Sequence, residues 1–151
     1  MSIVDPRVRR PERHEVLIQQ MRNDGGFPAM RDLMLFAAGI GFAQERRIPF
    51  DKTAEPIRYE ILINDALAEP FISMLAAVAK EGDPEILDAT RLSERITIFE
   101  EYANGGLEYI QEQVNVRREP LDVVVRSLTI ENLSDAAAAR GASIEELLDT
   151  F

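Results

Sequence analysis

Helical periodicity dominates the pattern of apolar and polar positions along the chain. The clearest stretch runs through residues 96–114, where apolar side chains recur every three or four positions. The triplet Asn104-Gly105-Gly106 lies inside this stretch. Because the periodicity keeps its phase across the triplet, we predict one long helix with a weak point rather than two helices joined by a turn.

Four further segments predict helices. They cover residues 12–22, 27–42, 66–80 and a stretch beginning at Pro120, although the valines at 123–125 fit a strand equally well. The helix that starts at Phe27-Pro28 is so apolar that we expect it to be nearly buried and central to the core. Its glycines, Gly39 and Gly41, are interpreted as points of close packing rather than as a phosphate-binding loop.

One segment alternates between apolar and polar residues with the period of a strand. It spans residues 57–64, and a lone strand needs a partner to be stable. The candidates are residues 47–50, the N-terminal arm and a second subunit. The expected architecture is therefore a compact, mainly α-helical domain of five to seven helices with one short strand or hairpin near residues 47–63, with an α+β fold as the alternative.

The length of 151 residues suits a single domain, expected to span residues 1–151 with a flexible arm over residues 1–11. The hydrophobic share of 46% provides a core, and the absence of cysteine excludes disulfides and thiolate chemistry. No apolar run reaches the roughly 18 residues that a membrane helix needs. We expect a cytoplasmic protein that makes no membrane contact.

No catalytic or cofactor-binding motif stands out. His14 is the only histidine, and its charged neighbours Arg13 and Glu15 indicate an exposed position without companion ligands. The carboxylates of Glu100, Glu101, Glu108 and Glu112 are interpreted as a solvated acidic face rather than as acid–base pairs. We therefore expect no catalytic residue, no cofactor and no metal site.

Charge divides the chain into two unequal halves. Residues 1–60 sum to +1 and residues 61–151 to −11, which together give the net charge of −10. Any contact with nucleic acid is thus expected in the first half, where the candidate residues are Arg7, Arg9, Arg10, Arg46 and Arg47. Residues 135–148 have the cadence of a helix-turn-helix, but carboxylates occupy the would-be recognition helix, which disfavours DNA binding there.

Several sequence blocks together resemble a known family. They are Val8-Arg9-Arg10-Pro11, residues 30–38 with Gly41-Phe42, residues 46–50, Glu55-Pro56-Ile57-Arg58, residues 82–87 and residues 98–107. The chain resembles the small accessory protein found with bacterial DNA phosphorothioation (Dnd) systems. The resemblance covers about residues 7–114, and the tail after residue 115 is expected to be particular to this chain.

The resemblance implies a context, namely sulfur modification of the DNA backbone and the associated phage defence, and it implies no catalytic residues. We expect a non-enzymatic accessory or adaptor that binds another protein of such a system, using Glu101, Glu108 and Glu112 for the contact. The alternative is a DNA-binding regulator that uses the five arginines on phosphates. DNA contact is expected to be weak, and homo-oligomerisation is left open.

Overall fold

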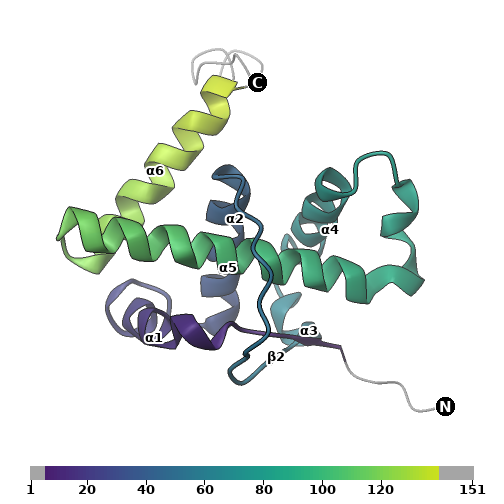
Figure 1. Cartoon of the computed structure of the whole chain (residues 1–151), viewed down its shortest axis with the longest axis horizontal. Coiled ribbons are helices and arrows are strands. Elements are labelled where there is room, and N and C mark those ends of the chain that lie inside the picture. Colours follow the sequence, from purple (N-terminus) through teal and green to yellow (C-terminus); the bar gives the residue numbers. More distant parts are fainter. Residues whose placement is uncertain (1–5, 140–151) are drawn as a thin grey trace.

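The computed structural model describes residues 6–139, within which six α-helices pack together with a two-stranded sheet (Figure 1). In chain order, the elements are β1 (Arg7–Val8), the 3₁₀ turn η1 (Glu12–His14), α1 (Glu15–Asp24), α2 (Met30–Ala43), β2 (Ile57–Arg58), α3 (Tyr59–Leu62), α4 (Ala68–Ala79), the 3₁₀ turns η2 (Pro84–Leu87) and η3 (Ala89–Arg91), α5 (Leu92–Arg117) and α6 (Leu121–Ala139). The prediction of a mainly α-helical fold with one short β element is confirmed.

Helix α5 forms the axis of the fold, and α2 crosses behind it at a steep angle (Figure 1). The crossing is unusually close because glycines face each other there. A β-carbon on Gly106 would overlap the carbonyl oxygen of Ala37, and one on Gly41 would overlap the carbonyl oxygen of Tyr102. The prediction that Gly41 is a close-packing point is confirmed, whereas Gly39 has only Phe71 nearby, at 3.9 Å.

The long connection between α2 and β2, residues 44–56, runs across the front of α5, and we call it the strap (Figure 1). Its centre is bonded to the helix: Ile48 N donates to the carbonyl of Glu101, and Asn104 Nδ2 donates to the carbonyl of Ile48, both at 3.0 Å. Gly105 leaves the space that the Arg46 carbonyl occupies. The triplet predicted to be a weak point therefore lies inside one unbroken helix, where it receives both α2 and the strap.

The predicted strand over residues 57–64 is wrong beyond its first two residues. Ile57 and Arg58 pair with Val8 and Arg7, so the N-terminal arm is the partner strand. Tyr59 N still donates to the carbonyl of Pro6 at 2.9 Å, but proline has no amide hydrogen for the reciprocal bond. The ladder therefore ends, and residues 59–62 form α3 instead.

The valine run at 123–125 is helical, and α6 continues as one helix to Ala139. Its first half packs on the body through Val124, Val125 and Leu128, all buried, while its C-terminal end extends away from the other helices (Figure 1). The segment with the cadence of a helix-turn-helix, residues 135–148, lies mostly outside the described residues. No helix in the described part of the chain has the length and apolarity required to cross a membrane.

Candidate functional site

The arginines and glutamates predicted as separate contact surfaces lie next to each other in the fold. Arg46 pairs with Glu108 at 3.2 Å and with Glu112, and Arg47 pairs with Glu101 at 3.1 Å. Each pair joins the strap to the same face of α5. We call these pairs, together with a pair between Arg13 and Glu108, the Arg–Glu network.

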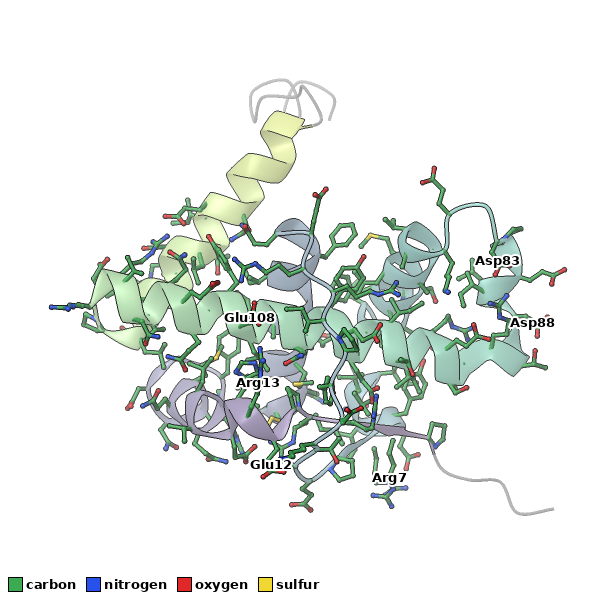
Figure 2. The ribbon with its side chains drawn as sticks, viewed as in Figure 1. Arg7, Glu12, Arg13, Asp83, Asp88 and Glu108 are labelled. Atoms are coloured by element: carbon green, nitrogen blue, oxygen red, sulfur yellow. The ribbon has the colours of Figure 1, made fainter. Side chains whose placement is uncertain are left out.

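Arg13 of η1 completes the network by pairing with Glu108 at 2.7 Å. Figure 2 shows its side chain extending from η1 toward Glu108 on α5. The acidic face of α5 is thus covered by two segments from the first half of the chain and neutralised by their guanidinium groups. Partly exposed ion pairs of this kind contribute only about 0.2–1 kcal/mol each to stability.

The N-terminal arginines differ in their surroundings. Arg10 is buried and bonds the carbonyl of Glu55 at 2.6 Å and the carboxylate of Glu15 at 3.0 Å. Arg9 pairs with Glu100 at 3.0 Å and lies over the ring of Phe50. Arg7 is exposed and points away from the body (Figure 2).

Glu100 does not belong to a solvated face, contrary to the sequence-based expectation, because it is only 2% exposed. Burial raises the pKa of its carboxyl group, while hydrogen bonds and the charge of Arg9 act in the opposite direction. The adjacent residue Glu101 points about 100° away around the helix, toward the strap. The pair therefore serves two different contacts and shares no proton.

The prediction that His14 is exposed is also wrong, since it is 7% exposed. Its charged neighbours are a misleading signal because the 3₁₀ turn η1 directs the imidazole inward while Arg13 reaches outward. Burial, followed by the positive charge of Arg13, lowers the pKa of His14 to about 4. Its Nε2 accepts a hydrogen bond from Arg13 Nε at 2.9 Å, which fits a neutral ring.

The charged groups of this region are engaged mainly with one another. Within residues 6–139, no cluster of three or more His, Asp or Glu side chains is placed to hold a metal ion. His14 contacts Arg13 rather than a nucleophile, and the carboxylates of the Arg–Glu network are bound to arginines. These pairs connect η1 and the strap to α5.

A different region has the geometry of a binding surface. An open groove of about 590 Å³ lies between α2, α4 and α6, and we call it the α2–α4–α6 groove. Most of its lining is apolar: Leu35, Phe36, Gly39, Ile40, Phe42, Ala43, Leu67, Ala68 and Phe71, with Asp65, Thr129 and Asn132 as the polar members. Figure 1 shows the C-terminal end of α2 between α4 and α6.

The sequence contains a pattern that indicates this groove, although the same pattern also fits a fully buried helix. Phe36, Ile40 and Phe42 widen the apolar stripe of α2 beyond the width that one packed helix covers. In the structure, Phe36 and Phe42 remain partly accessible, and Leu67 beside them is 76% exposed. An apolar stripe wider than the neighbouring helices can cover indicates an exposed binding surface rather than additional core.

The family model of DNA sulphur modification system-associated protein 4 matches residues 7–146. The chain belongs to this family. No curated protein and no solved structure matches it significantly.

Membership in the DNA sulphur modification system-associated family confirms the resemblance seen in the sequence blocks. The match also corrects its extent, because the segment after residue 115 lies mostly within the family region rather than being particular to this chain. The groove wall supplied by α6 consequently belongs to the region that defines the family. The family description associates the chain with a DNA sulphur modification system.

Proposed function

We propose that this chain is a non-enzymatic accessory protein that binds another protein of its DNA sulphur modification system, within a phage-defence context. The α2–α4–α6 groove is the observation that carries the proposal. Open apolar surfaces of this size on a small protein are characteristic of sites that bind other molecules.

The Arg–Glu network favours this function over a DNA-binding regulator. Of the five arginines considered for phosphate contact, Arg9, Arg10, Arg46 and Arg47 each form an ion pair with a glutamate of the same chain. Contact with phosphate would have to break these pairs. The net charge of −10 further opposes the approach of DNA.

The same network bears on the acidic residues proposed for the protein contact. Glu101, Glu108 and Glu112 are bound by strap and η1 arginines, so a partner would have to compete for them. The groove requires no such exchange. We therefore assign the main protein contact to the groove and give the three glutamates a role in holding the strap.

Co-purification tests the function directly. The tagged chain is expressed together with the proteins encoded beside its gene, and the retained proteins are identified by mass spectrometry. We expect retention of a protein of the DNA sulphur modification system that survives a salt wash. Failure to retain any of them would refute the adaptor function.

A gel-shift titration over a salt series tests the alternative. We expect weak binding to duplex DNA at physiological salt. Tight binding with a steep salt dependence, abolished by replacing Arg7, Arg9, Arg10, Arg46 and Arg47 with alanine, would support the regulator instead.

A further inference from the structure

The shape and chemistry of the α2–α4–α6 groove allow its occupant to be specified. We propose that the groove receives an amphipathic α-helix of the partner protein, with apolar side chains in the groove and a lysine or arginine beside Asp65. This inference rests on the proposed function, since it names the part of the partner that binds.

The backbone around the groove excludes an extended peptide as the occupant. The walls are formed mainly by helices, whose internal hydrogen bonds use their backbone groups. In the turn before α4, Leu67 N donates to Asp65 Oδ1 at 2.9 Å and Ala68 N donates to the Asp65 carbonyl at 3.1 Å. An added strand would find few backbone partners here, whereas a helix satisfies its own backbone groups.

The polar side chains of the lining are almost fully used as well. Asn132 Oδ1 accepts from Gln44 at 2.8 Å, and Asn132 Nδ2 donates to the carbonyl of Leu128 at 2.6 Å. Thr129 donates to the carbonyl of Val125 at 2.8 Å. The carboxylate of Asp65 is therefore the polar group of the lining with the most remaining capacity, so the occupant should be apolar with one cationic contact.

Charge around the groove points the same way. Asp65 is the sole charged residue among the described lining residues, and the exposed Glu45 and Glu69 follow the lining residues Ala43 and Ala68 by two positions and one position in sequence. A partner helix with a basic polar face would complement this rim, and an acidic one would be repelled.

Helix α6 supplies the remaining wall of the groove through Thr129 and Asn132. The partner helix would lie between α4 and α6 over the C-terminal half of α2.

Designed peptides test the occupant without the partner. Two fluorescent helical peptides of about 18 residues share one leucine-rich face and carry either lysine or glutamate on the other. A third repeats the lysine peptide with a central proline that breaks the helix. Fluorescence anisotropy at physiological salt gives each dissociation constant for the full-length chain.

Matched variants separate groove binding from general attraction to an acidic protein. Gly39→Phe fills the groove without changing the charge, and Val78→Phe adds the same side chain at an exposed position of α4 outside the groove lining. Asp65→Asn removes the proposed contact, while Glu81→Gln removes the same charge from an exposed site outside it. Melting temperatures confirm that each variant is folded.

We expect the lysine peptide to bind the wild type about tenfold more tightly than it binds Gly39→Phe, with Val78→Phe like the wild type. Asp65→Asn should weaken binding about twofold to fivefold, and Glu81→Gln should not. Equal affinity of the lysine peptide for wild type and Gly39→Phe would show that the groove is not the binding site. If the glutamate or proline peptide bound as tightly as the lysine peptide, or more tightly, the occupant would not be a basic helix.

Sedimentation of the chain alone tests the competing occupant. A dimer that Gly39→Phe dissociates would assign the groove to a second copy and overturn the inference. The proposed function fails separately, by the absence of a retained system protein in co-purification. Retention that Gly39→Phe leaves unchanged would refute the groove inference while the adaptor function stands.

Discussion

The two sides of helix α2 contain similar residues but have opposite environments. Toward α5, Gly41 meets the backbone of Tyr102 so closely that no β-carbon fits. Toward α4 and α6, Gly39 lines an open groove, where an added β-carbon would have Phe71 Cζ as its nearest neighbour at 3.9 Å. One helix thus contributes a closed structural contact and an open surface, and glycine alone does not distinguish them.

The two sides of α2 differ in which contacts they make. The crossing of α2 and α5, with the strap on the other side of α5, fixes the fold through backbone contacts at Gly41, Gly105 and Gly106. The groove has no comparable backbone contact and is left apolar. Substitutions on the two sides should therefore separate stability from binding.

The largest effect is expected for Gly106→Ala. The added methyl group would overlap the backbone of Ala37, which cannot move as a flexible side chain could. We expect a loss of about 5 kcal/mol or more, enough to prevent folding. Circular dichroism and thermal unfolding measure this, and a cooperative transition near that of the wild type would contradict the close crossing.

Phe99→Ala should cost about 3–5 kcal/mol, because the fully buried ring loses both its transfer energy and its packing. Urea unfolding gives the free energy. A loss below about 1 kcal/mol would show that the ring is not part of the core.

The pH dependence of stability should carry a contribution from His14. Its pKa in the folded chain is about 4, below the usual 6.5. Between pH 6.5 and pH 4, His14 therefore binds a proton in the unfolded chain but not in the folded chain. Stability should therefore fall, by about 1–2 kcal/mol, as pH falls from 6.5 toward 4.

Urea unfolding at pH 7 and pH 5 for the wild type and His14→Gln isolates this contribution. The raised pKa of Glu100 makes stability fall as pH rises, which is the opposite of the His14 effect. Glu100 is present in both proteins, so its contribution cancels when their pH dependences are subtracted. Identical pH dependence of the two proteins would mean that His14 titrates normally.

Arg46→Ala should cost about 1 kcal/mol, because it removes the pairs with Glu108 and Glu112 and the contact with the Tyr109 ring. Arg7→Ala is the matched control, since the Arg7 side chain is exposed and points away from the body. It should change stability by less than about 0.5 kcal/mol. Equal effects would show that the network does not hold the strap.

The smallest effect is expected for Gly39→Ala. The space is free, and alanine favours a helix over glycine by up to about 1 kcal/mol. Thermal unfolding should show an unchanged or slightly raised melting temperature. A clear destabilisation would mean that Gly39 is packed as Gly41 is.

Periodicity was sufficient to predict most helices, including the unbroken α5, because an amphipathic stripe reports directly on local geometry. It failed at residues 59–62, where Tyr59, Ile61 and Ile63 follow strand spacing while Tyr59 and Leu62 follow helix spacing. The missing amide hydrogen of Pro6, which lies opposite Tyr59, favours the helix. The choice between strand and helix at Tyr59 thus depends on Pro6, which lies more than fifty positions away in the sequence.

The candidate site was less predictable for a similar reason. Arg46 and Glu108 are far apart in sequence, and local reasoning assigned them to separate surfaces although the opposite charges of the two halves were visible. The groove required knowing which helices cover α2. A wide apolar stripe shows how much surface is apolar but not which part remains open.

The most direct test of the groove as the partner-binding surface is retention of the system partner by Gly39→Phe, measured beside its melting temperature. We predict that the variant keeps the melting temperature of the wild type to within a few degrees, about what 0.5 kcal/mol produces, and loses most of the retained partner. Full retention by a folded Gly39→Phe would contradict the assignment of the open side of α2 to partner binding.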